Sequence, residues 1–184
     1  MNDSRELHVI FGTGPVGTTL ADELLARGRR VRLVNRSGKG QVAPDAELVK
    51  GDALLPQAVH DLTRGAAVVY HAANVAYQNQ VEVMPKMQQS ILEGVAASKT
   101  KLVVMDTLYL YGETHGQVMT EDTPFRATTR KGRMRAELAQ NYLKAHRDGL
   151  APVTLARAAD FYGPRVRNSA MGDRVFPQAI AGQR

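Results

Sequence analysis

The 184-residue sequence contains no cysteine and no tryptophan. The absence of cysteine excludes disulfides, thiolate catalysis and cysteine-ligated zinc. The five histidines show no HExxH-like spacing, so we expect no metal site. No segment approaches the roughly 20 apolar residues that a membrane-spanning helix needs, and we expect no membrane partner. The first residues lack a cationic segment followed by an apolar one, which leads us to expect a cytoplasmic protein.

Acidic residues are scarce in two segments, and these segments account for the net charge of +6. Residues 24–44 contain six lysines and arginines and no acid, while residues 126–147 contain seven against Glu137 alone. Neither segment interleaves its cations with the aromatic residues that stack on nucleic-acid bases. We therefore expect no nucleic-acid partner and interpret the charge as a positive field around a phosphate-rich cofactor.

Short apolar runs rich in branched residues alternate with longer helical patterns, which is typical of parallel strands joined by crossover helices. The pattern predicts one α/β domain with a doubly wound parallel sheet of six or more strands. The predicted strands are Leu7–Phe11, Val31–Val34, Glu47–Lys50, Ala67–Tyr70, Leu102–Met105 and Val153–Ala156. The predicted helices are Pro15–Arg27, Leu54–Thr63, Val81–Ser98 and Arg130–Arg147.

The turn after the first predicted strand fits the spacing GxGxxG. Its residues are Gly12, Thr13, Gly14, Pro15, Val16 and Gly17. In a dinucleotide site the first glycine permits a tight turn, the second lets the backbone approach a pyrophosphate, and the third permits close packing of helix on strand. The helix that follows would present unpaired N–H groups to the phosphates. The spacing alone is a weak signal, but its place between a strand and a helix favours a dinucleotide site over a plain glycine turn.

The end of the second predicted strand bears on the choice of cofactor. A site for NAD(H) usually has Asp or Glu here to accept hydrogen bonds from the adenosine ribose, whereas this sequence has Asn35, Arg36 and Ser37. A guanidinium and a hydroxyl can both bind a 2′-phosphate, so we expect NADP(H) to be preferred over NAD(H). In the alternative interpretation Arg36 is a solvated loop cation and Asn35 binds the ribose of either cofactor.

Further segments follow the later strands in a recognisable order. They are Gly51-Asp52, His71-Ala72-Ala73-Asn74, Tyr111-Gly112 and the run from Arg157 to Pro164, which is similar to RxxNxYGP. Together with the glycine turn, they make the chain resemble the extended and atypical short-chain dehydrogenase/reductases, the NAD(P)-dependent epimerase/dehydratase group. The resemblance runs nearly end to end and implies an NAD(P)-binding Rossmann fold.

The resemblance also assigns roles to single residues. It implies that Asp52 and Ala53 contact the adenine and that Ala72 and Ala73 line the path toward the nicotinamide. Asp52 could instead cap the helix that begins near Leu54.

The catalytic residues of the group are only partly matched. The group uses a Tyr and a Lys spaced YxxxK with a Ser or Thr that positions the substrate oxygen. Thr107 matches the Ser/Thr position, whereas Thr129 and Arg133 stand where Tyr and Lys are expected. An aliphatic hydroxyl is a much weaker acid than a phenol, so Thr129 cannot simply replace the tyrosine as a proton donor.

Three explanations of this departure remain open. Tyr109, or less readily Tyr111, could supply the phenol. A proton could come from substrate or water, aided by the cations near Lys131 and Arg133. In the third explanation the protein binds its cofactor without turnover and acts as a redox sensor.

Length is a second departure from the resemblance. The group usually carries a small carboxy-terminal substrate lobe, so we expect residues 1–184 to be a Rossmann domain truncated before that lobe. A covering subunit, or the lack of a large substrate, would also account for the length. We expect an oxidoreductase or epimerase-like protein that acts on a hydroxyl or carbonyl of a small molecule whose identity the sequence leaves open. Homodimers formed through helices such as 81–98 and 130–147 are common in the group.

Overall fold

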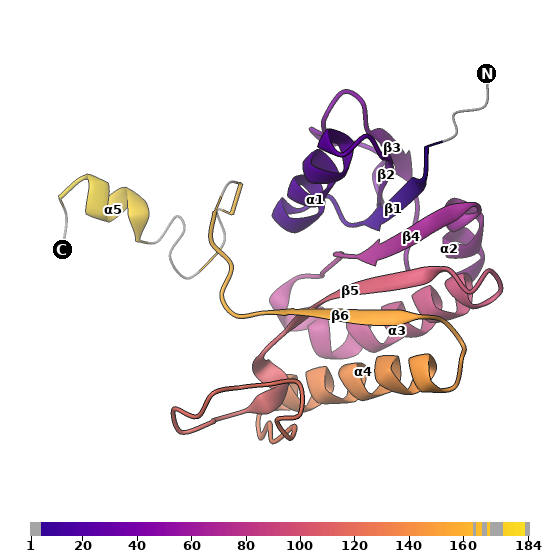
Figure 1. The fold of residues 1–184 in the computed structure, drawn as a ribbon. Coiled ribbons are helices and arrows are strands. Elements are labelled where there is room, and N and C mark those ends of the chain that lie inside the picture. Colours follow the sequence, from indigo (N-terminus) through magenta and orange to yellow (C-terminus); the bar gives the residue numbers. More distant parts are fainter. Residues whose placement is uncertain (1–4, 164, 167–168, 170–174, 183–184) are drawn as a thin grey trace.

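A six-stranded, entirely parallel sheet forms the centre of the protein (Figure 1). The computed structural model describes residues 5–163, 165–166, 169 and 175–182. The strand order is β3-β2-β1-β4-β5-β6. The strands are β1 (Leu7–Phe11), β2 (Arg30–Asn35), β3 (Glu47–Lys50), β4 (Ala66–His71), β5 (Lys101–Thr107) and β6 (Val153–Ala158). The chain therefore reverses its direction of travel across the sheet between β1 and β4, which is where α/β proteins form ligand clefts.

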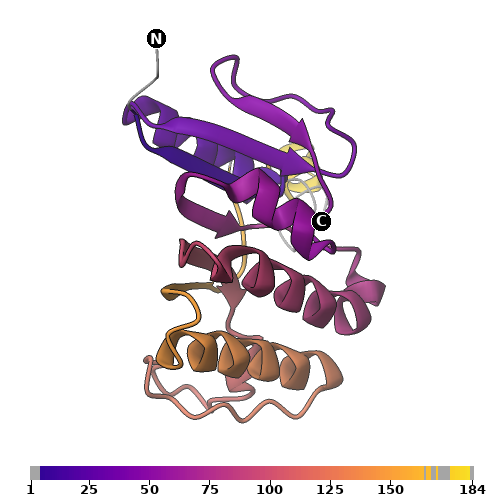
Figure 2. The same ribbon diagram turned by 90° about the vertical axis from the view of Figure 1, so that its right-hand side faces the viewer.

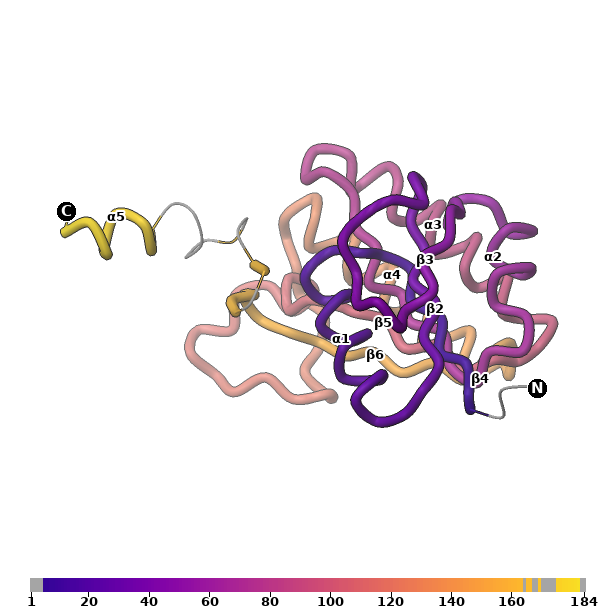
Figure 3. The backbone as a smooth tube through the Cα atoms, turned by 90° about the horizontal axis from the view of Figure 1, so that it is seen from above, coloured from indigo at the N-terminus to yellow at the C-terminus, as the bar shows by residue number. Residues whose placement is uncertain are grey.

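Helices cover both faces of the sheet (Figures 2 and 3). One face carries α1 (Pro15–Ala26), and the other carries α2 (Pro56–Thr63), α3 (Gln80–Ala96) and α4 (Arg130–Arg147). Two 3₁₀ turns, η1 (Tyr77–Asn79) and η2 (Tyr109–Tyr111), follow β4 and β5. A short helix, α5 (Phe176–Ile180), lies apart from the sheet, and its side chains are exposed (Figures 1 and 3). In the part of the chain that the structure describes, no helix combines the length and the apolar character required to span a bilayer.

The predicted doubly wound sheet is confirmed, with small differences at the ends of elements. Strand β5 continues to Thr107, two residues past the predicted end, because its last residues pair with Ala156–Ala158 of β6. Helix α2 begins at Pro56 rather than Leu54, since Leu54 belongs to a turn in which its N–H donates to the Asp52 carboxylate. Proline suits the first helical position because its missing N–H has no partner to lose there.

The core is split by the sheet into two layers. The larger layer packs β1, β4 and β5 against α3, with Val9, Val69 and Ile91 fully buried. The smaller layer packs Ile10 and Leu33 against α1. Every residue of β1 is buried, as expected for the central strand of a sheet covered on both faces. This burial holds the carboxyl end of β1, where the glycine turn begins, in a fixed place.

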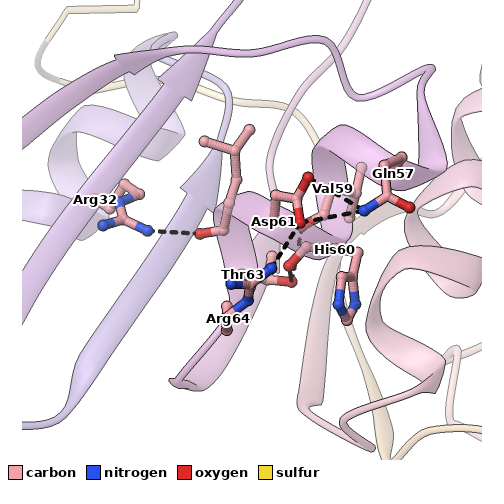
Figure 4. A network of polar contacts seen from close by, with 8 residues as sticks. Arg32, Gln57, Val59, His60, Asp61, Thr63 and Arg64 are labelled. Carbon is pink, nitrogen blue, oxygen red and sulfur yellow. Dashed lines mark hydrogen bonds and ion pairs between the residues drawn. The ribbon is translucent and has the colours of Figure 1, made fainter.

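A polar contact joins α2 to strand β2 of the sheet, and others lie within and beside the helix (Figure 4). Arg32 of β2 donates to the Leu62 carbonyl at 2.8 Å, and Asp61 accepts hydrogen bonds from Gln57 of the same helix and from Arg64, which follows its last residue. Arg32 also pairs with Glu47 of β3 at 2.9 Å. Part of the basic segment 24–44 is thus neutralised by acids from elsewhere in the chain.

Candidate dinucleotide site at the carboxyl edge of the sheet

A cavity of about 560 Å³ opens where β1, β2, β4 and β5 end. Its wall includes most of the residues that the sequence assigned to a cofactor. Those residues are Gly12, Thr13, Gly14, Pro15, Val16, Asn35, Arg36, Asp52, Ala53, Ala72 and Ala73. Segments that are far apart in the sequence, from Gly12 to Ala73, therefore meet at one site. Gly17 and Ser37 do not line the cavity. Gly17 lies where α1 packs against Ile10 and Gly12.

The structure gives a different reason for each of the three glycines of the turn. Gly12 has φ +110°, and a Cβ there would lie 2.7 Å from the Ala73 nitrogen, so backbone geometry and packing both require glycine. A Cβ on Gly17 would overlap the Gly12 carbonyl oxygen. A Cβ on Gly14 would meet no protein atom within 4 Å, and Gly14 has ordinary extended dihedrals of φ −75° and ψ −177°. No packing contact within the protein requires a glycine at position 14, whereas a ligand lying against the backbone would.

Helix α1 points its amino terminus at the cavity. Gly14 is its N-cap and makes no side-chain capping bond, Pro15 is the first helical residue, and the first turn contains no acid. The N–H groups of this turn and the helix dipole are therefore available to an anion. The arrangement suits the pyrophosphate of a dinucleotide.

The residues after β2 form an ordered loop beside the cavity. The Asn35 amide donates to the Thr13 hydroxyl at 2.9 Å and to the Lys39 carbonyl at 3.0 Å, and its carbonyl oxygen accepts from the N–H of Gly38. Ser37 donates to the same Asn35 oxygen at 3.0 Å and so serves the loop. Arg36 is exposed, lines the cavity and makes no ion pair with any described residue. Its guanidinium is free to meet a phosphate at this end.

The side walls come from the ends of β3 and β4. The Asp52 carboxylate accepts the Leu54 N–H at 2.9 Å, so it orders the turn before α2 while also lining the cavity. Ala53 is 8% exposed and Ala72 donates its N–H to the Phe11 carbonyl at 2.9 Å. Small residues at these positions leave room for flat rings between the strand ends.

Thr107 lies at the far end of the cavity, at the last position of β5. Its hydroxyl is buried and has no hydrogen-bond partner among the described residues. Leaving a buried hydroxyl without a hydrogen-bond partner lowers the stability of the fold by about 1–3 kcal/mol. A ligand oxygen in the cavity would supply the missing partner.

The structure does not bring Tyr109, Thr129 or Arg133 into the cavity. Thr129 is the N-cap of α4, and its hydroxyl accepts the Gly132 N–H at 3.0 Å. Arg133 follows on the exposed side of α4, and Tyr109 is 53% exposed in η2; neither lines the cavity. Helical periodicity turns position 133 toward solvent. The assignment of Thr129 and Arg133 to the Tyr and Lys positions of the group stays a prediction.

Arg135 lines the cavity instead, although no sequence motif assigns it a role. Only 5% of its surface is exposed. It lies on the buried side of α4 with Met134, Leu138 and Tyr142. Helical spacing from Leu138 and Tyr142 could have identified this position, because residues three and seven places before them share their face.

A buried polar layer supports this end of the cavity. The Nδ1 atom of His71 lies 2.9 Å from the Tyr142 hydroxyl, which joins β4 to α4. Burial, and then the nearby Arg135 charge, lower the pKa of His71 to about 4, while a backbone hydrogen bond at Ala73 opposes the shift. His71 is therefore neutral at physiological pH. Burial likewise raises the pKa of Tyr142, so this phenol does not ionise in the working range.

The strand order, the glycine turn and the cavity at the switch point define a Rossmann-type dinucleotide-binding domain. The profile of the NAD dependent epimerase/dehydratase family matches residues 9–183. The chain belongs to this family.

Known proteins resemble the chain over part of their length. It is 25% identical over 187 aligned positions to the UDP-N-acetyl-alpha-D-glucosaminuronate decarboxylase of Bacillus cytotoxicus, covering 92% of this chain and 58% of that protein. The fold matches a UDP-N-acetylglucosamine 4-epimerase from Bacillus cereus with a TM-score of 0.82 at 18% identity, covering 96% of this chain and 61% of the other. A dTDP-glucose 4,6-dehydratase from Bacillus anthracis, solved with NAD, gives 0.81 at 18% identity, with coverage of 96% and 62%. The chain thus spans about three fifths of the length of these relatives.

Proposed function

We propose that this chain binds a nicotinamide dinucleotide in the carboxyl-edge cavity and forms the cofactor half of an oxidoreductase or epimerase-like protein. The observation that carries the proposal is Gly14, whose missing side chain serves no packing inside the protein. The pyrophosphate would lie against Gly14 and the amino terminus of α1, with the adenosine toward Arg36 and Asp52 and the nicotinamide toward Ala73 and Thr107. Relatives solved with NAD support this type of ligand.

The chemistry at the nicotinamide end follows from Thr107. Its unpartnered hydroxyl would hold the reacting hydroxyl or carbonyl oxygen of the substrate beside the ring. When bound, the cofactor would accept or give a hydride at that carbon. We propose a nucleotide-linked sugar as the substrate, since the names of the relatives specify such compounds.

Fluorescence titration with NADH and NADPH tests cofactor binding. We expect saturable binding, and we expect Gly12→Val to abolish it because the side chain would meet the Ala72–Ala73 backbone. A matched change outside the site, Gly149→Val, has no neighbouring atom within 4 Å and controls for the effect of valine at a position of positive φ. Absence of binding to the unmodified chain would overturn the proposal.

Within this function we propose that NADP(H) is preferred, on the basis of Arg36. A hydrogen bond to a charged group contributes about 1.5–3 kcal/mol, so we expect NADPH to bind at least about tenfold more tightly than NADH. Arg36→Glu should reverse the order, because a carboxylate repels the 2′-phosphate and can accept from the ribose. Equal affinities for both cofactors, unchanged in the variant, would show that Arg36 is only a solvated cation.

A second function, that of a non-catalytic redox sensor, is favoured by one observation. No tyrosine lines the cavity among the residues that the structure describes. A sensor would change its affinity for a partner on binding cofactor, without turnover over a panel of carbonyl compounds and nucleotide sugars. Activity that survives in Tyr109→Phe would show that this phenol is not the proton donor.

A further inference from the structure

Arg135 is a buried cation without a matching anion. It is 5% exposed, and it forms no ion pair within 4 Å with any described residue. Its one hydrogen bond to a side chain is a long contact of 3.5 Å with the Gln80 oxygen. Its Nε atom is buried and has no partner. A guanidinium removed from water in this way is costly unless an anion pairs with it.

The nearby carboxylate is already engaged. Asp106 is buried beside Arg135 and attracts it electrostatically. However, the Asp106 carboxylate pairs with Arg157 at 3.2 Å, and Arg157 also donates to the Tyr111 hydroxyl at 2.7 Å. Arg135 and Arg157 thus have one carboxylate, Asp106, near them, and it pairs with Arg157. The cluster of these three side chains therefore carries an uncompensated positive charge. His71 adds none, because it is neutral above pH 5.

The uncompensated charge faces the same cavity as Thr107. Both side chains line it, both have a buried polar atom without a partner, and they come from different elements, β5 and α4. Arg36 and the amino terminus of α1 are available to the phosphates of the dinucleotide. The nicotinamide ribose is neutral and would leave the charge of Arg135 uncompensated.

We propose that Arg135 binds a carboxylate on the substrate while Thr107 holds the reacting oxygen, which makes the substrate a sugar acid or a similar hydroxy acid. This inference rests on the proposed function, because it assumes that the cofactor occupies the rest of the cavity. A guanidinium suits the task because its planar fork matches the two oxygens of a carboxylate.

The test compares two ligands that differ only at one carbon. The protein is first saturated with NADH, and the affinities of UDP-glucuronate and UDP-glucose are then measured by calorimetry. We expect UDP-glucuronate to bind at least about tenfold more tightly, as a charge-assisted hydrogen bond would give. Arg135→Met should bring the ratio near one, and Arg135→Lys should keep part of it. Arg147→Met, at the exposed end of the same helix, is the matched control.

The outcomes separate this inference from the proposed function. Failure of the unmodified protein to bind NADH removes the proposed function. Normal NADH binding with equal affinities for the two nucleotide sugars, or with neither bound, overturns the carboxylate site alone. If Arg135→Met instead weakens NADH while the ratio persists, Arg135 belongs to the cofactor and the inference is also overturned. Circular dichroism of each variant shows that it has folded.

Discussion

At the scale of single residues, a substitution of Gly14 should change cofactor binding with less effect on folding than a substitution of Gly12 or Gly17. A methyl group there meets no protein atom and the backbone dihedrals suit alanine. We expect Gly14→Ala to change the thermal midpoint little, because the restriction of the unfolded chain by alanine is offset by the poor fit of alanine to the N-cap position of α1. The same change should weaken NAD(P)H binding at least about tenfold, since the methyl group would occupy space needed by the pyrophosphate.

Gly17→Ala is the matched comparison, because its methyl group would overlap the Gly12 carbonyl and should destabilise the fold itself. Thermal melts and fluorescence titrations of both variants provide the measurement. Cofactor affinity unchanged in Gly14→Ala would mean that the ligand does not approach this backbone.

His71 makes stability depend on pH. Its pKa is lowered to about 4 in the folded protein, chiefly by burial, while the unfolded value is near 6.5. The unfolded chain therefore binds more protons between these values, and stability falls as pH decreases from about 6.5 toward 4. The shift corresponds to about 3 kcal/mol of unfolding free energy lost across this window. Urea melts from pH 7 to 4 measure it, and His71→Gln should show a shallower slope; an identical slope would assign the loss to other groups.

At the scale of elements, the start of α4 depends on Thr129. Its hydroxyl accepts the Gly132 N–H at 3.0 Å, which satisfies one of the unpaired donors of the first turn. Replacing such a cap with alanine costs about 0.5–2 kcal/mol, so we expect Thr129→Ala to lower stability by about 1 kcal/mol and Thr129→Ser to restore most of it. Cofactor affinity should not change, because the side chain lies outside the cavity. A large loss of affinity without loss of stability would return Thr129 to the site.

The elements also show how far the sequence could be interpreted. Apolar runs and the glycine turn predicted all six strands and the four long helices, because burial on both faces of a sheet leaves a clear pattern in composition. The orientation of α4 about its own axis was harder to predict from the sequence. The motif spacing predicted Arg133 as the arginine at the site, whereas the structure buries Arg135. Which of the two faces inward depends on how Leu138 and Tyr142 pack, and the motif does not encode that packing. The hydrogen bonds that commit Ser37 to its own loop leave no sequence signal either.

At the scale of the whole molecule, the centre of the sheet and α5 should differ strongly in local stability. Strand β1 is buried along its length and is bonded to β2 and β4. Helix α5 has five residues with exposed side chains, and so short a helix is unstable without packing. We expect amides of Val9 and Ile10 to exchange with solvent only on global unfolding, and those of α5 to exchange at close to unprotected rates. Hydrogen exchange followed by mass spectrometry measures both. Protection of α5 equal to that of β1 would show that it packs against something in solution.

The cavity also has three methionines in its wall, Met84 and Met87 from α3 and Met105 from β5. Thioether side chains are unbranched and polarisable, so they adapt their shape to a neighbour at little cost. The glycine turn, which also lines the cavity, is held by close backbone contacts and cannot adapt in this way. One wall of the cavity is therefore rigid and the other compliant. Oxidation of these methionines to the sulfoxide would make the compliant wall polar. Oxidants would therefore change the apolar part of the ligand site while leaving the glycine turn intact.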